Sequence, residues 1–185
     1  MKLIIGITGA SGAIFGIRTL EVLKALSVET HLVMSRWART TITHETEYRV
    51  EQVEALASHV YHGDNQAAPI SSGSFRTDGM IVAPCSMKTL AAIRIGYSDT
   101  LICRAADVIL KERRKLVLVA RESPLSEIHL ENMLSLTRMG AVIFPPVPAF
   151  YSVPKTIDDV VNYLVGRVLD QFGLEVPDLS RWSGF

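Results

Sequence analysis

The chain has 185 residues, of which 48% are hydrophobic and 21% are charged, values typical of a globular domain with an ample core. Nineteen Lys and Arg balance nineteen Asp and Glu, so the chain lacks the basic excess expected of a sequence-independent nucleic-acid binder. A net charge of zero also does little to keep copies apart, which favours self-association into a homo-oligomer.

Both the cysteine spacing and the hydrophobic runs predict a cytoplasmic protein. Cys85 and Cys103 stand far apart and form no metal-binding or disulfide pattern, so a reducing compartment is expected. The first apolar run, 3–7, is too short for a secretory signal. Every apolar run is also shorter than the roughly 18 residues that would predict a membrane span.

Short apolar runs alternate with longer helical patterns along the whole chain. The first run, 3–8, predicts a strand buried on both faces, and a glycine turn at 9–12 leads into a helix over 13–26. The other predicted strands are 29–35, 60–61, 79–84, 115–119 and 141–144, and the other predicted helices are 38–47, 50–57, 86–95, 101–111, 126–139 and 156–172.

This alternation predicts an α/β fold, with a parallel sheet flanked by helices on both faces. We expect a single domain over 1–173 and a tail over 174–185, which could pack on a neighbouring subunit. Ligands of such sheets bind beyond the carboxyl ends of the strands. The loops at these ends are 9–12, 35–37, 84–89, 121–124 and 145–154.

The first two of these loops favour a mononucleotide. The turn at 9–12 lacks the dinucleotide glycine spacing, but its amides can face an anion at a helix N-terminus; the alternative is a plain tight turn. The second strand ends in Ser35-Arg36, with no acid for an NAD ribose. A hydroxyl and a guanidinium suit the phosphate of FMN or NADP, unless they are a helix cap and a surface arginine.

The third and fourth loops supply hydroxyls, a cysteine and an acid. Ser86 and Thr89 can cap a helix and hold a phosphate, whereas Cys85 is expected to pack rather than to act as a nucleophile. Glu122 follows the most apolar strand, where burial would raise its pKa and make it a proton donor. The alternative for Glu122 is a surface ion pair.

The charge cluster 111–115 is expected to be a solvated helix end, with one exception. Lys111 could turn inward, and Arg104, two helical turns earlier, would share its face.

Aromatic side chains at Phe150, Tyr151 and Trp182 stand where a substrate or a packing partner would lie, and their π faces would stabilise a cationic transition state.

The histidines predict no metal site. His129 and Glu131 share a helix without the His-Glu-x-x-His spacing, so buried structural roles are expected for them. That helix begins at Ser126 without the acidic residue of a full capping box. The remaining histidines, at positions 31, 44, 59 and 62, also lack ligand spacing.

Five segments together resemble the flavin prenyltransferase family, the UbiX-like group long described as phenolic-acid decarboxylases. These segments are GASGA at 9–13, SRWA at 35–38, PCSMKTLAAI at 84–93, RAADVILKERRKLVLVARESPLSEIHLENM at 104–133 and PAFY at 148–151. The resemblance covers positions 2 to about 182 and is greatest for the branch associated with hydroxyarylic acid decarboxylases.

The resemblance implies a Rossmann-like fold, reduced FMN and a dodecamer. It implies that the enzyme joins a dimethylallyl group from dimethylallyl monophosphate to N5 and C6 of FMN without a metal, and that a UbiD-type decarboxylase receives the product. Two alternatives stay open: an FMN-dependent enzyme that itself decarboxylates aromatic acids, and a carrier that only hands over FMN.

The resemblance also implies residue roles. Ser11 would lie near N5, Glu122 would handle a proton, Lys111 would act on the prenyl phosphate, and Glu45 would reach in from a neighbouring subunit. The FMN contacts would be Gly9, Ala10, Ser11, Ser35, Ser72, Ser86, Met87, Lys88, Thr89 and Arg121. The prenyl phosphate would be held by Arg104, Lys111, Tyr151 and Arg167. Where this chain has Met87-Lys88, other members have Thr-Gly or similar.

Overall fold

A computed structural model describes residues 1–177, 179, 181, 182 and 184. Its sheet is six-stranded with the order β3-β2-β1-β4-β5-β6, and every neighbouring pair is parallel, as predicted. The strands are β1 (Lys2–Ile7), β2 (Glu29–Met34), β3 (His59–Tyr61), β4 (Gly79–Cys85), β5 (Lys115–Ala120) and β6 (Val142–Ile143).

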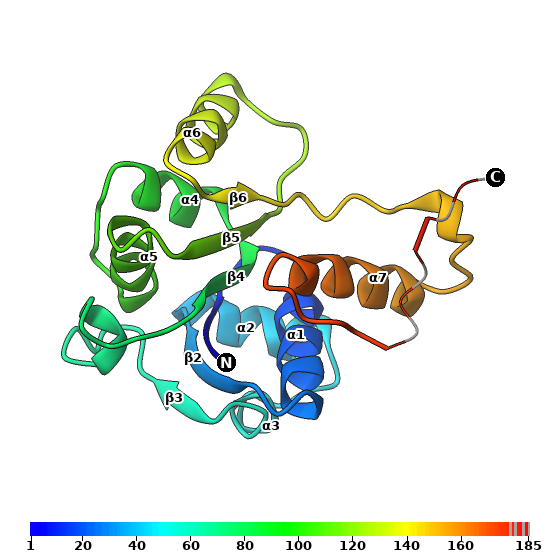
Figure 1. The fold of residues 1–185 in the computed structure, drawn as a ribbon, viewed down its shortest axis with the longest axis horizontal. Coiled ribbons are helices and arrows are strands. Elements are labelled where there is room, and N and C mark those ends of the chain that lie inside the picture. Colours follow the sequence, from blue (N-terminus) through cyan, green and yellow to red (C-terminus); the bar gives the residue numbers. More distant parts are fainter. Residues whose placement is uncertain (178, 180, 183, 185) are drawn as a thin grey trace.

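Helices cover both faces of this sheet (Figure 1). The helices are α1 (Ala13–Ala25), α2 (Arg36–Glu45), α3 (Val50–Glu54), α4 (Met87–Arg94), α5 (Leu101–Lys111), α6 (Glu127–Arg138) and α7 (Ile157–Asp170). In Figure 1, α4, α5 and α6 lie on one side of the sheet, and α1, α2, α3 and α7 lie on the other. The prediction of a doubly covered parallel sheet is therefore confirmed.

Local differences from the predicted elements have local causes. α2 begins at Arg36, two residues early, because the Ser35 hydroxyl caps the helix and accepts from the Ala38 amide at 3.0 Å. Both long loops contain a short 3-10 turn, at Pro69–Ser71 and at Phe150–Ser152. α6 does have a reciprocal cap: the His129 amide donates to the Ser126 hydroxyl, and the Ser126 amide donates to His129 Nδ1 at 3.2 Å. The imidazole thus replaces the acidic residue that the sequence lacks.

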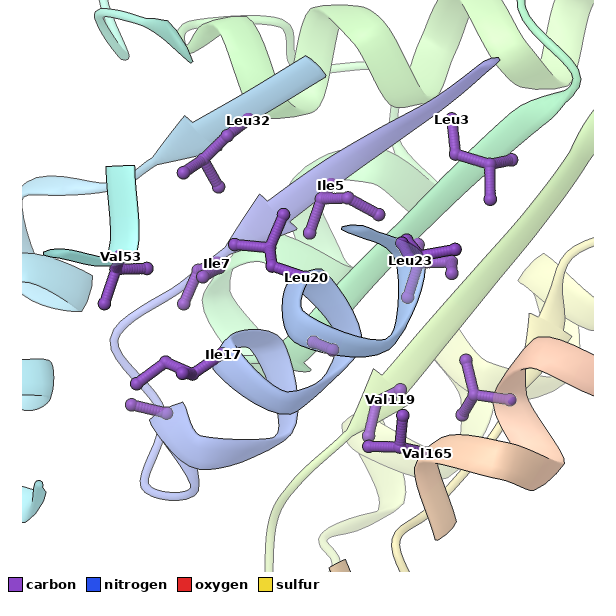
Figure 2. Packing of buried hydrophobic residues seen from close by; sticks show 14 of the residues in the cluster. Leu3, Ile5, Ile7, Ile17, Leu20, Leu23, Leu32, Val53, Val119 and Val165 are labelled. Atoms are coloured by element: carbon purple, nitrogen blue, oxygen red, sulfur yellow. The ribbon is translucent and has the colours of Figure 1, made fainter. Parts of the chain in front are cut away.

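Alternate residues of β1 enter two separate hydrophobic clusters. Leu3, Ile5 and Ile7 point toward Leu20 and Leu23 of α1 (Figure 2). Ile4 joins the cluster on the opposite face, with side chains from α4 and α5. Because strand residues alternate between faces, the continuous apolar run buries β1 on both sides.

The C-terminal part of the chain packs on its own domain. Arg18 of α1 donates to Asp158 at 2.8 Å and also to Asn162, which ties α7 to α1. Leu179 lies against Gly166, and Arg181 donates to both carboxylate oxygens of Asp170 at 2.7 and 3.0 Å. The described part of the tail therefore contacts α7 of the same chain, and its contact with a neighbouring subunit stays a prediction. Positions 178, 180, 183 and 185 lie outside the described residues.

Within the described residues, every helix is too short or too polar to cross a lipid bilayer.

Candidate active site

The strand order reverses between β1 and β4, which is where parallel α/β sheets bind their ligands. The carboxyl ends of these two strands are joined through Thr8, whose side chain is buried. Its hydroxyl donates to the Pro84 carbonyl at 2.7 Å and accepts from the Ser86 amide at 2.9 Å. Thr8 thereby fixes the turn after β1 against the turn after β4.

The turn at Gly9–Gly12 leads directly into α1. Gly12 adopts a left-handed backbone conformation with φ 100° at the N-cap position, which favours glycine. Gly9 also has a steric reason to be glycine, because an added Cβ would lie 2.3 Å from Cβ of Trp37. The resulting close approach brings the chain between Gly9 and Ser11 against the start of α2.

Glu45, the last residue of α2, occupies the N-terminus of α1. Its Oε2 accepts from the amides of Gly12 at 2.8 Å and Ala13 at 3.2 Å. Although partial burial opposes ionisation, hydrogen bonds from the Ser11 side chain and from these amides, together with the charge of Arg121, hold the pKa of Glu45 below its ordinary value. Within the described chain Glu45 binds the turn of its own chain, and its contact with a neighbouring subunit stays a prediction.

A cavity of about 480 Å³ opens beside this turn, a volume within the usual range for small-ligand sites. The turns after β1 and β5 and the proline-rich loop form its wall, which is lined by Ser11, Gly12, Phe15, Ala120, Arg121, Glu122, Ser123 and Pro145–Pro148. Charged groups thus meet an apolar wall at the predicted edge of the sheet.

Glu122 lies at this cavity, but it is not desolvated as predicted. Its side chain is exposed in the single chain, and its Oε1 accepts from the Ser123 amide at 3.0 Å. The backbone of Arg121 is fixed in position, because its amide donates a hydrogen bond to the Cys85 carbonyl at 3.2 Å. The burial expected at the end of β5 stops at Ala120.

Two helix N-termini face the same edge with hydroxyl caps. Ser35 caps α2, and Ser86 caps α4, where its Oγ lies 3.1 Å from Thr89 Oγ1 and 3.4 Å from the Thr89 amide. Thr89 is buried, Met87 is half-buried, and Lys88 is exposed with Nζ 3.8 Å from Asp99. Hydroxyls at helix N-termini are suitable donors for a phosphate group.

Cys85 packs in the core, as predicted. Its side chain is fully buried, and burial raises the pKa of its thiol far above the ordinary value. A nucleophilic role needs a thiolate, which this environment opposes.

Ser72, Arg104 and Lys111 lie outside this cavity. Lys111 ends α5 near the amino end of β5; it is exposed and pairs with Glu112 instead of turning inward. A Cβ on Gly73 would lie 2.7 Å from Lys111 Nζ, so the loop that carries Ser72 packs against this lysine. Arg104 donates to the Ser71 carbonyl at 3.1 Å and to Asp107 at 2.7 Å.

Tyr151 and Arg167 are brought together through a residue that the sequence did not single out. The Tyr151 and Tyr163 hydroxyls are hydrogen-bonded, and their rings meet edge to face at 6.0 Å between centroids. Burial and the Tyr151 hydroxyl raise the pKa of Tyr163, whereas the positive charge of Arg167 opposes that shift. Trp182 stacks edge to face on Tyr151 at 5.3 Å, which adds the described part of the tail to this group.

The buried structural roles predicted for His129 and Glu131 are wrong. His129 is half-buried and Glu131 is exposed, so neither has the expected buried role. Glu29, His31 and His59 place one potential metal-ligand atom each within 4.8 Å of one another. Sequence spacing could not indicate this group, because the pairing of β2 with β3 brings it together.

Comparisons with known proteins agree on one family. The model of the family described as flavoprotein matches residues 1–169. A curated Escherichia coli O157:H7 protein, described as a probable UbiX-like flavin prenyltransferase, is 64% identical over 185 residues, covering 100% of this chain and 94% of that protein.

Two solved structures cover the whole of this chain. AnUbiX, solved in complex with FMN and dimethylallyl pyrophosphate, has 60% identity and a TM-score of 0.98, covering 100% of this chain and 98% of its own. A dodecameric protein from Escherichia coli O157:H7, described as an FMN-dependent UbiX-like decarboxylase, has 64% identity and a TM-score of 0.98, with 100% of both chains covered. This chain therefore belongs to the flavoprotein family and, within it, to the UbiX-like flavin prenyltransferases.

Proposed function

We propose that this chain is a flavin prenyltransferase, which joins a dimethylallyl group to N5 and C6 of reduced FMN. The main observation in support of this function is the similarity of the chain to a solved structure that holds both FMN and dimethylallyl pyrophosphate. The two chains are 60% identical, and they superpose with a TM-score of 0.98. We further propose that a UbiD-type aromatic acid decarboxylase receives the prenylated FMN.

The donor groups at the carboxyl edge of the sheet fit FMN. We assign its phosphate to the N-termini of α2 and α4, because Ser35 and Ser86 supply hydroxyls there. The adjoining FMN contacts would be Met87, Lys88 and Thr89. Gly9, Ala10, Ser11 and Arg121 would contact the ring system, which would supply the two atoms that accept the dimethylallyl group.

The residues around the cavity would handle protons and exclude water. Glu122 carries an accessible carboxylate that can accept a proton. Glu45 accepts a hydrogen bond from Ser11 and would fix the orientation of that hydroxyl beside N5. Phe15 and the proline-rich loop form an apolar wall that would protect an allylic cation from water.

Breaking the bond to the donor's phosphate without a metal requires cations aimed at the leaving group. Arg104 and Lys111 are the proposed cations, yet the structure leaves both outside the cavity of their own chain. We therefore propose that they serve the cavity of a neighbouring copy in a homo-oligomer, as is feasible in a dodecamer like that of the E. coli relative. Tyr151 and Arg167, linked through Tyr163, would close over the same phosphate.

A second candidate is an enzyme that itself decarboxylates aromatic acids. The description of the E. coli structure as a decarboxylase favours it. An FMN carrier is the third candidate, although a carrier needs neither Glu122 nor a cation for a leaving group.

The deciding experiment is anaerobic incubation of the full chain with reduced FMN and dimethylallyl monophosphate, followed by mass spectrometry of the extracted flavin. We expect a flavin heavier by one C5H8 unit. A parallel reaction with dimethylallyl pyrophosphate tests whether the second phosphate is tolerated. Unmodified flavin, with carbon dioxide released from a hydroxybenzoate in the absence of any partner, would contradict the proposal in favour of the decarboxylase.

We also propose the cytoplasm as the location, because two free, buried cysteines suit a reducing compartment.

A further inference from the structure

Three potential metal ligands converge at the amino edge of the sheet. The pairing of β2 with β3 places His31 opposite His59, and Glu29 precedes His31 by two residues, which puts both on the same face of β2. Glu29 Oε1 lies 3.1 Å from His31 Nε2 and 3.4 Å from His59 Nε2. One carboxylate oxygen thus meets two imidazole nitrogens.

The ring of His31 is held in one orientation. Its residue is only 1% exposed, and its Nδ1 lies 2.9 Å from the Tyr61 hydroxyl. Phe75 packs edge to face against the same ring at 5.2 Å between centroids. A hydrogen bond at one ring nitrogen that orients the other is the usual arrangement around a metal-binding histidine.

We propose that Glu29, His31 and His59 bind a divalent transition-metal ion, with Zn²⁺ as the ion best suited to two imidazoles and one carboxylate. Zn²⁺ binds three such protein ligands and completes its tetrahedron with water. Mg²⁺ and Ca²⁺ prefer oxygen ligands and are poorly matched to this set.

Metal binding requires only a small movement of the ligand side chains, and His59, the exposed ligand, is the one expected to move. The three ligand atoms lie within 4.8 Å of one another, and atoms bound to one Zn²⁺ at about 2.0–2.2 Å lie no more than about 4.4 Å apart. The two imidazole rings stack at 4.6 Å with an interplanar angle of 19°, so one ring must turn to direct both nitrogens at one ion. The His59 side chain is 52% exposed, whereas the His31 ring is buried and also contacts Tyr61 and Phe75.

Lys2 competes for the same carboxylate. Its Nζ lies 3.1 Å from Glu29 Oε1 and sits over the Phe75 ring at 4.6 Å from the centroid. An arriving cation must displace this ammonium, so removing the Lys2 charge should strengthen metal binding.

This site is separate from the proposed transfer site. Glu29 begins β2, whereas the cavity lies beyond the other end of the neighbouring β1, about 15–20 Å away at 3.3 Å per strand residue. β3 is a three-residue edge strand, and the ion would join it to β2. We expect metal to stabilise the fold, and we expect prenyl transfer to proceed without it.

The test uses the full chain, without an affinity tag and stripped by EDTA, titrated with Zn²⁺ alone by calorimetry. We expect one ion per chain in the wild type. Binding should weaken by more than about tenfold in His59→Gln and Glu29→Gln, and by about tenfold in Tyr61→Phe, which removes only the hydroxyl that orients His31. Lys2→Met should bind more tightly.

The matched control is His62→Gln, which removes an exposed histidine paired with Asp64 outside the cluster and should leave binding unchanged. The melting temperature of the wild type should rise with Zn²⁺, and that of His59→Gln should not. The proposal fails if the wild type takes up no Zn²⁺, or if His59→Gln and His62→Gln bind it equally. Neither result depends on the flavin assay, so the metal site and the proposed function can fail independently.

Discussion

Glu45 Oε2 lies 2.8 Å from the backbone nitrogen of Gly12, so the chain's own carboxylate fills the N-terminus of α1. A helix N-terminus favours one negative group through its free amides and its dipole. Because Glu45 takes that place, we expect the phosphate of FMN to bind at α2 or α4 instead. The glycine turn would then bring the chain close to the ring system, as proposed.

Glu45 should make the stability of the protein depend on pH in the acid range. Its folded-state pKa is below the ordinary value of 4.5, so its contribution is present above that value and is lost as the pH falls through the folded value. Glu45→Gln removes this contribution. We therefore expect the melting temperature of the wild type to fall more steeply than that of the variant below about pH 4.5.

The control for Glu45 is Glu47→Gln, which neutralises an exposed carboxylate just beyond the end of α2. Its melting temperature should follow that of the wild type across the same pH range. Parallel curves for the wild type and Glu45→Gln would show that the contact with Gly12 does not stabilise the folded chain.

Thr8→Val tests the link between the turns after β1 and β4. Valine keeps the shape, but it removes a hydroxyl that donates to Pro84 and accepts from Ser86. Leaving such buried groups unpaired should lower the free energy of unfolding by about 1–3 kcal/mol. FMN affinity should also fall, because Ser86 caps α4 at the proposed phosphate site. Urea denaturation and flavin fluorescence measure the two effects.

Thr19→Val is the matched control for this substitution. Thr19 is equally buried, but its hydroxyl only donates to the Phe15 carbonyl one turn earlier in α1. We expect a smaller loss of stability and unchanged FMN affinity. An equal loss of FMN affinity in both variants would assign the effect to general destabilisation.

The sheet could be predicted from the sequence because its strands are continuous apolar runs separated by helical patterns. The apolar run that contains β1 predicts burial on both faces, and the structure has Ile4 and Ile5 in opposite clusters. Glycine and hydroxyl residues at the strand ends also indicate which edge of the sheet forms the cavity. These features depend on local periodicity, which a single sequence contains.

Other features depend on which distant segments pair, and the sequence does not contain that information locally. His31 and His59 meet only through the register of β2 and β3. Glu45 meets the α1 turn only because α2 folds back beside it. The inward turn predicted for Lys111 failed because Glu112, the next residue, pairs with it at the surface.

The two cysteines should resist thiol reagents in the folded protein. Burial raises the pKa of Cys85 and also that of Cys103, so neither forms much thiolate near neutral pH. Ellman's reagent should therefore react slowly with the native chain and reach both thiols in denaturant. Rapid reaction of one thiol in the native state would reopen the question of a nucleophilic cysteine.

The proposed exchange of residues between subunits can be tested by complementation. Lys111→Ala and Glu122→Gln should each lower the rate of prenyl transfer by about 100-fold or more, because one loses a cation for the leaving group and the other loses a proton acceptor. When the two variants are co-expressed, some cavities should combine an intact Glu122 with an intact Lys111 from the neighbouring copy. Random assortment would restore activity at about a quarter of the sites.

The pair Glu45→Gln and Glu122→Gln is the control for this complementation. Glu45 contacts Ser11, and Ser11 and Glu122 line one cavity of a single chain, so every mixed site would lack one of the two carboxylates. Co-expression of these variants should restore no activity. If the Lys111 and Glu122 variants also fail to complement each other, Lys111 acts within its own chain, and the loop that packs against it must move to let it reach the cavity.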